Sequence, residues 1–272
     1  MGIKSRIKSI LGKQEEVGAV NVPPTTQLSL AAAQLDSIPR YTSGVMNFLE
    51  NKLEFTDSTS TKFIIGELFD IGIYEFKTES KQPYIIDCGA NIGLSIIYFK
   101  KLFPLAEVIG FEPDANVFQV LSSNMKSFGL GAVELYQKAL WSSDKQLTFY
   151  SEGADAGRVE QNENAATVQI DAVRLSPFLQ RKVDFLKIDI EGAELEVLEE
   201  CAASLQNVER IFVEYHSFVG KPQRLARLIE ILEDAGFRLS INTPGLVSVK
   251  PFVHLKKYNG MDMQLNIYAF RS

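Results

Sequence analysis

The sequence predicts an α/β fold in which helices cover both faces of a doubly wound, mostly parallel β-sheet. Strand-like and helix-like segments alternate from Tyr84 onward, as in successive βαβ units. Between Tyr84 and Phe103 an apolar strand runs into Asp87, Gly89 and Gly93 bracket a turn, and an apolar helix follows. The composition agrees, because 272 residues with 46% hydrophobic and 23% charged content suit one large domain with an appendage.

Sequence features divide the chain into three regions, which are residues 1–26, 27–82 and 83–272. In the first region, residues 1–13 are basic and place isoleucine and leucine at helical spacing, and the Pro23-Pro24 pair marks a linker behind them. Such a segment predicts peripheral contact with an anionic membrane. A solvated terminus, or a helix docked on the domain, is the alternative.

The second region, residues 27–82, is expected to be an extension of the main domain. Residues 27–54 are predicted to be mostly helical, with an interruption near Pro39. Residues 63–76 alternate as strands do, between glycines that mark turns, and predict a small β element.

The third region, residues 83–272, supplies the alternating segments of the main domain. The predicted strands are 84–88, 107–112, 133–139, 183–189 and 208–215, with 146–150 and 166–170 in an insertion and a final pair at 238–242 and 264–270. The predicted helices are 92–102, 114–127, 193–203 and 221–236.

Composition excludes several classes of protein. The net charge of −6 argues against nucleic-acid binding, which needs a basic footprint. Cys88 and Cys201 are far apart and lack metal-ligand spacing, so we expect a reducing, cytoplasmic compartment and no disulfide framework. No segment approaches the roughly 18 apolar residues of a spanning helix. Any membrane contact is therefore expected at the inner face, through residues 1–13.

The glycine turn predicts the ligand. Asn91 breaks the G-x-G-x-x-G pattern of dinucleotide-binding loops, and the turn lacks the Gly-Lys-Ser/Thr ending of a P-loop. Asp87 stands two residues before Gly89 and suits an ammonium group, whereas Glu112, at the tip of the next strand, suits the hydroxyls of a ribose. A ligand with an amino-acid end and a ribose end is S-adenosylmethionine. Alternatively, Asp87 caps the turn and Glu112 is a solvated acid at a strand end.

Polar side chains also follow two later strands. Asp189 and Glu191 end the strand predicted at 183–189, and Glu214 and His216 end the next one. Because ligands of open parallel sheets sit outside the carboxyl ends of the strands, we expect these side chains to share a crevice with the glycine turn.

Four segments, in this order and spacing, resemble the FkbM family of S-adenosylmethionine-dependent methyltransferases: DCGANIG (87–93), GFEPD (110–114), KIDIEGAE (187–194) and VEYHS (213–217). KIDIEGAE is the most specific of the four. The resemblance implies a class I methyltransferase (Rossmann-like) fold with an antiparallel last strand. It also implies methyl transfer to a hydroxyl of a saccharide, glycan or natural-product acceptor, often in bacterial biosynthesis.

The resemblance also implies which residues contact the cofactor. They belong to the matching segments and are Asp87, Gly89, Asn91, Gly93, Glu112, Pro113 and Asp189. In this fold the adenine borders the third strand, which adds Ala139 and Leu140.

An alcohol acceptor is a poor nucleophile while it keeps its proton, so a positioned base is expected. His216 has the natural pKa for this task, and Glu191 or Asp189 would serve if burial or mutual repulsion made them better proton acceptors. Alternatively, Asp189, Glu191 and His216 bind a divalent metal that lowers the pKa of the acceptor, although no tight ligand spacing supports a metal. The structural alternatives are that His216 hydrogen-bonds a loop, Asp189 caps the helix near Ala193, and Glu191 shapes a turn.

Two other functions stay open at this point. A nucleotide-dependent oxidoreductase is disfavoured by Asn91 inside the turn and Asp87 before it. A non-catalytic module that kept the S-adenosylmethionine pocket is disfavoured by the retained acids, which are Asp87, Glu112, Asp189 and Glu191.

Overall fold

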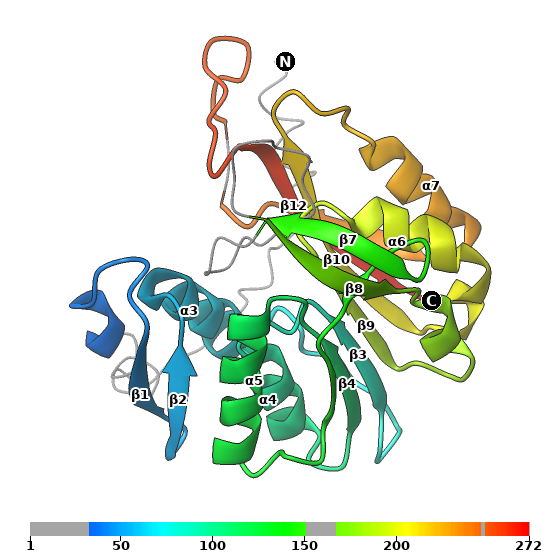
Figure 1. Ribbon diagram of the computed structural model, residues 1–272. Helices are drawn as coiled ribbons and strands as arrows, with labels where there is room; N and C mark the ends of the chain where they lie inside the picture. The colour runs from blue at the N-terminus through cyan, green and yellow to red at the C-terminus, as the bar shows by residue number, and fades with distance from the viewer. Residues whose placement is uncertain (1–32, 151–166, 246–247, 272) are drawn as a thin grey trace, which may run out of the picture.

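The computed structural model describes residues 33–150, 167–245 and 248–271. Its centre is a seven-stranded sheet with the order β11-β12-β10-β9-β3-β4-β5 (Figure 1). The bounds are β3 Tyr84–Cys88, β4 Glu107–Phe111, β5 Glu134–Tyr136, β9 Phe185–Ile188, β10 Arg210–Phe218, β11 Arg238–Asn242 and β12 Met261–Phe270. The strands from β10 to β5 pair in parallel, whereas β12 is antiparallel to both β10 and β11. The mostly parallel sheet with an antiparallel last strand is thus confirmed.

Helices cover both faces of this sheet. They are α4 Leu94–Leu102 and α5 Ala115–Ser127 on one face and α6 Glu194–Cys201 and α7 Leu225–Asp234 on the other (Figure 1). Successive residues of β3 point to opposite faces, so Ile85 joins the core beneath α4 and α5 while Ile86 joins the core beneath α6 and α7. Each helix buries its apolar side against the sheet, and the loops at the carboxyl ends of the strands are left to form a site.

The prediction of mostly helical structure for 27–54 was wrong for most of its described part. Only 33–36 is helical, and β1 Gly44–Phe48 pairs with β2 Asn51–Phe55 in an antiparallel hairpin. Apolar side chains alternate along both strands and are buried, and they are Met46, Phe48, Leu53 and Phe55. Leu49 and Glu50, between the strands, both have positive φ, as a two-residue hairpin turn requires. This period of two, rather than a helical period, was the signal in the sequence.

The hairpin is tied to the main domain by Asn124 of α5. The Asn124 amide donates to the carbonyls of Glu54 at 2.9 Å and Ile92 at 2.8 Å, and its oxygen accepts from the Glu54 N–H at 2.8 Å. Asn124 is fully buried, so these bonds satisfy its polar atoms. Because Ile92 lies in the glycine turn, one side chain fixes both the hairpin and the turn.

The prediction of a β element at 63–76 was also wrong. A helix, α3 Ser58–Ile65, continues into a π-helical stretch, Gly66–Ile71 (η1). Asp57 caps α3 by accepting from the Ser60 N–H at 2.9 Å. Ser58, Thr61, Ile65 and Leu68 are buried, and this spacing of three, four and three residues follows a helix.

The segment 133–139, predicted as one strand, is divided. β5 ends at Tyr136, and Ala139–Leu140 forms β6, which joins β8 Thr167–Val173 and β7 Lys145–Tyr150 in a separate three-stranded sheet. Short 3-10 segments at Ser176–Leu179 (η2) and Ala202–Asn207 (η3) complete the described elements, and η3 takes the place of the last turn predicted for the 193–203 helix. The basic segment 1–13 lies outside the described residues. No helix among the described residues is long and apolar enough to cross a membrane.

Candidate active site

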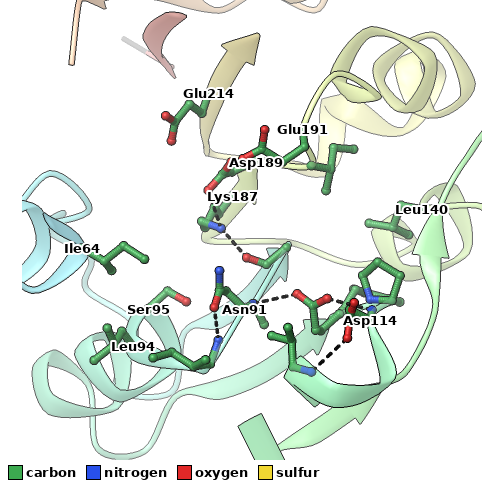
Figure 2. A pocket seen from close by; sticks show the side chains of 18 of the residues that line it. Ile64, Asn91, Leu94, Ser95, Asp114, Leu140, Lys187, Asp189, Glu191 and Glu214 are labelled. Carbon is green, nitrogen blue, oxygen red and sulfur yellow. Dashed lines mark hydrogen bonds and ion pairs between the residues drawn. The ribbon is translucent and has the colours of Figure 1, made fainter. Parts of the chain in front are cut away.

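A cavity opens beyond the carboxyl ends of β3, β4, β9 and β10, where open α/β sheets place their ligands. Residues from α3 and η1 form its opposite wall, including Phe63, Ile64, Glu67 and Leu68. Figure 2 shows Asp189, Glu191 and Glu214 gathered at one end and Asp114 and Leu140 at the other. The cavity therefore has two chemically different ends.

The glycine turn forms the floor of this cavity. Gly89, Asn91 and Gly93 have φ of +94°, +47° and +92°, a left-handed conformation that glycine adopts without strain. A Cβ on Gly89 would lie 1.9 Å from the backbone oxygen of Asp189, so no larger residue fits there. Gly93 has a packing role, because a Cβ there would meet Met125 Cε at 2.6 Å. Gly89 and Asn91 line the cavity, and Gly93 does not.

Glu112 is held rigidly beside the turn. Its Oε2 accepts from the Asn91 N–H at 3.1 Å and its Oε1 accepts from the Asp114 N–H at 2.9 Å. Burial raises the pKa of Glu112 to about 7, an effect that the two backbone donors only partly oppose. Each carboxylate oxygen keeps a free lone pair, so Glu112 can accept two hydroxyls of a ligand.

Asp87 lies beneath the cavity and does not line it. It is fully buried, accepts a short hydrogen bond from the Ser95 hydroxyl, and lies 3.2 Å from the ammonium of Lys187. Lys187 does line the cavity, lies 3.2 Å from Asp189 Oδ2, and donates to the Gly89 carbonyl at 2.7 Å. Burial opposes the charge of Lys187, but these two carboxylates outweigh it and raise its pKa. The ammonium partner predicted for Asp87 is thus supplied by the protein itself.

Four acids line the end of the cavity that lies away from Asp114 and Leu140. They are Glu67, Asp189, Glu191 and Glu214. Burial, and then the charge of Asp189, raises the pKa of Glu67 to about 7 and that of Glu214 to about 8. Gln264 of β12 donates a short hydrogen bond to Glu214. These side chains can therefore accept protons or hydrogen bonds near neutral pH.

His216 is buried behind these acids and is not a lining residue. Its Nδ1 lies 2.9 Å from Glu194 Oε1, and its Nε2 lies 3.8 Å from both Glu191 Oε2 and Glu214 Oε1. Burial would lower the pKa of His216, but the three carboxylates outweigh burial and raise it well above its usual range. The three carboxylates therefore favour the positively charged form of His216, whose charge offsets theirs.

The helix after Asp189 begins without a cap from Asp189, which was the structural alternative for that residue. Its N-cap residue is Ala193, which makes no side-chain cap, and the Gly192 N–H instead donates to Glu194 Oε1 at 2.9 Å. Glu191 has a φ of +53°. This strained turn places Glu191 on the cavity wall.

Tyr74 adds a polar group that the sequence did not indicate. Its ring is held in an aromatic cluster, stacked on Phe99 at 5.8 Å between ring centroids and edge-on to Phe212 at 4.7 Å. It is 4% exposed and lines the cavity, and its hydroxyl has no hydrogen-bond partner among the described residues. Burial, and then the carboxylates of Asp189 and Glu214, raises its pKa, so the phenol keeps its proton.

The structure brings most of the predicted residues to one cavity. Those that line it are Gly89, Asn91, Glu112, Pro113, Ala139, Leu140, Asp189 and Glu191, whereas Asp87, Gly93 and His216 lie outside the lining. Glu67, Tyr74 and Lys187 line it and were not predicted. Glu67 was missed because its segment was interpreted as a strand, although the helical spacing behind Asp57 was present in the sequence.

One group of side chains has the composition of a cation site. Ligand atoms of Asp189, Glu214 and His216 lie within 4.8 Å of one another. This set replaces Glu191 of the predicted metal set by Glu214. Each member already has a protein partner. Asp189 pairs with Lys187, Glu214 accepts a hydrogen bond from Gln264, and His216 contacts Glu194.

Comparison with known proteins decides the family. The family model "Methyltransferase FkbM domain" matches residues 87–239, more than half of the chain. The chain belongs to the FkbM methyltransferase family. Members of this family are S-adenosylmethionine-dependent methyltransferases. The class I methyltransferase fold predicted for this chain is confirmed.

The chain is also similar to several known methyltransferases. "Methyltransferase 1" of Beauveria bassiana is 28% identical over 233 residues, which cover 72% of this chain and 92% of the relative. "2-O-methyltransferase NoeI" of Sinorhizobium fredii is 23% identical, covering 50% of this chain and 65% of the relative. "Hexuronic acid methyltransferase AglP" of Haloferax volcanii is 27% identical, covering 53% of this chain and 59% of the relative. At these identities the methyl acceptor of this chain stays a prediction. The bacterial source and the cytoplasmic compartment of the protein stay predictions as well.

The raised carboxyl pKa values predict a loss of stability with rising pH. Glu67, Glu112 and Glu214 have folded pKa values of about 7, 7 and 8, above the ordinary 4.5, so their stabilising contribution is present below pH 4.5 and is lost as the pH rises through 7 to 8. The raised pKa of His216 acts in the same direction above its ordinary 6.5. We expect the free energy of unfolding of the ligand-free protein, measured by urea denaturation, to fall between pH 5 and pH 8.

The matched variants are Glu214→Gln, which removes one raised carboxyl, and Glu233→Gln, which changes an exposed one. Glu214→Gln should flatten the decline and Glu233→Gln should leave it unchanged. Equal slopes in all three proteins would contradict the electrostatic description of this cavity.

Proposed function

We propose that this FkbM-family chain is an S-adenosylmethionine-dependent O-methyltransferase that methylates a hydroxyl of a saccharide, glycan or natural-product acceptor. The observation that carries this proposal is the division of one cavity into two ends. Glu112 stands beside a glycine turn at one end, and partly buried carboxyl groups line the other. The family supports methyl transfer. The names of two relatives, a 2-O-methyltransferase and a hexuronic acid methyltransferase, support oxygen and a sugar as the acceptor.

The residues present fit S-adenosylmethionine. Glu112 would accept the ribose hydroxyls, because each of its oxygens retains a lone pair. Pro113, Ala139 and Leu140 would border the adenine, and Gly89 lines the floor at a position where a Cβ would clash with the Asp189 backbone. Lys187 and Asp189 offer opposite charges to the two charged groups of the amino-acid end. Bound S-adenosylmethionine would supply the electrophilic methyl group.

The part proposed for the protein is to orient the acceptor hydroxyl and take its proton. Asp189, Glu191 and Glu214 line the acceptor end and accept hydrogen bonds, so one of them would receive the proton. His216 would act by positioning, because it is buried among Glu191, Glu194 and Glu214 and does not line the cavity. In this proposal His216 holds the acids in place rather than contacting the acceptor. A metal ion is not needed for these steps.

The cofactor role of Glu112 has a direct test. Glu112→Ala should weaken S-adenosylmethionine binding by about 1–3 kcal/mol, roughly 5- to 150-fold in Kd, because charge-assisted hydrogen bonds are lost. Glu107→Ala is the matched control, since Glu107 is at the other end of β4 and pairs with Arg181 on the surface. Calorimetry with S-adenosylmethionine and with NAD makes the measurement. Binding of NAD without S-adenosylmethionine would favour an oxidoreductase instead and contradict the proposal.

Transfer of a labelled methyl group to saccharide acceptors tests catalysis. Asp189→Asn, Glu191→Gln and Glu214→Gln are compared, and the variant of the base should lose about 10²- to 10⁴-fold in turnover. Glu214→Gln and Glu191→Gln should leave S-adenosylmethionine affinity near that of the parent. Normal turnover in all three variants would exclude a carboxylate base. Tight cofactor binding without transfer to any acceptor would favour a non-catalytic binding module.

A further inference from the structure

The connection between β11 and β12 carries an exposed apolar turn that the methyltransferase cavity does not use. It projects beyond the end of the sheet (Figure 1), and none of its residues lines the cavity. We call residues 248–258 the tip turn. Phe252 is fully exposed, and Val249 and Val253 are 87% and 83% exposed. Contact between large apolar side chains and water is unfavourable. The exposure of three such side chains at one place therefore requires an explanation.

The tip turn is folded rather than extended. The N–H groups of Val253 and His254 donate to the Lys250 carbonyl, both at 2.9 Å, and close a tight turn. Lower down, the Lys256 N–H donates to Ser248 Oγ at 2.9 Å, and Tyr258 pairs with Met261 at the start of β12. The apolar side chains are therefore presented by a turn that is fixed at its base.

Positive charge surrounds the apolar side chains. Lys250, Lys256 and Lys257 belong to the tip turn and are exposed, and no ion-pair partner occurs for them within the ranges that the structure describes. The sequence has no Asp or Glu between Asp234 and Asp262, although the chain as a whole has a net charge of −6. An anionic surface would repel most of this protein and attract this end of it.

We propose that the tip turn docks the protein on an anionic lipid bilayer, with Val249, Phe252 and Val253 inserted at the interface. Apolar side chains beside lysines suit the boundary between acyl chains and anionic headgroups. A projecting turn fits a bilayer better than a protein partner, because a stable protein interface covers about 800 Å² on each side and needs a broader complementary face. The proposal does not rest on the methyl-transfer reaction.

Vesicle flotation of the full chain tests the proposal. The vesicles are phosphatidylcholine alone, or phosphatidylcholine mixed with phosphatidylglycerol, at low and high salt. The protein should partition at least tenfold more strongly onto the anionic vesicles, and high salt should reduce this difference. The triple variant Val249→Ser, Phe252→Ser, Val253→Ser should lose most of the binding.

Two controls assign the effect to the tip turn. Leu105→Ser removes another exposed apolar side chain, one that lies outside the tip turn, and should bind as the parent does. A chain without residues 2–13 lacks the basic N-terminal segment. It should lose vesicle binding when the three serine substitutions are also made in it. Circular dichroism and cofactor binding establish that the triple variant is folded.

Three results would overturn the proposal. The full chain fails to bind either vesicle, the triple variant binds as well as the parent, or binding depends on residues 2–13 alone. Sedimentation equilibrium adds a fourth. If the triple serine variant converts a dimer into a monomer, a second copy of the chain covers the tip turn instead of lipid.

Discussion

A buried ion pair between Asp87 and Lys187 is the constraint on which the rest of the site depends. The register of β3 and β9 pairs these residues directly, so both side chains point to the same face of the sheet. Either charge alone would be costly at the sheet centre, because removing a buried ion from water costs several kcal/mol. The same ammonium also donates to the Gly89 carbonyl and approaches Asp189, which joins the glycine turn to the end of the neighbouring strand.

This arrangement explains why the two ends of the cavity differ. Lys187 neutralises Asp87 and part of Asp189, so the floor is polar without a large excess charge. At the other end, His216 is buried behind Glu191 and Glu214, and its Nε2 lies 3.8 Å from a carboxylate oxygen of each. The excess of carboxylates raises the pKa of Glu214 to about 8, after burial itself, and so retains protons where an acceptor hydroxyl would bind. Charge compensation in the sheet thus leaves the carboxyl groups with raised pKa values at this end of the cavity.

The sequence predicted the sheet well, and it predicted which strand-end residues meet at the cavity, because these signals are local. Asp87, Gly89 and Glu112 follow apolar strands at fixed spacing, and the topology then brings strand ends together. The hairpin and α3 were missed because their signals are short periodic patterns that compete with other assignments. The role of Lys187 depends on a strand pairing 100 residues apart, between Asp87 and Lys187, which no local pattern encodes. For the same reason, the sequence indicated only the ordinary pKa of a histidine for His216. In the structure, the carboxylates of Glu191 and Glu194 raise that pKa strongly.

A double-mutant cycle on Asp87 and Lys187 tests the central claim most directly. The quantity is the free energy of unfolding of the parent, Lys187→Met, Asp87→Asn and the double variant at neutral pH. We predict that Lys187→Met costs about 3–5 kcal/mol, because it leaves a buried carboxylate unpaired. Adding Asp87→Asn should then restore part of this loss, which gives a clear coupling energy. Additive losses, with the double variant less stable than Lys187→Met by the full cost of Asp87→Asn, would contradict the claim.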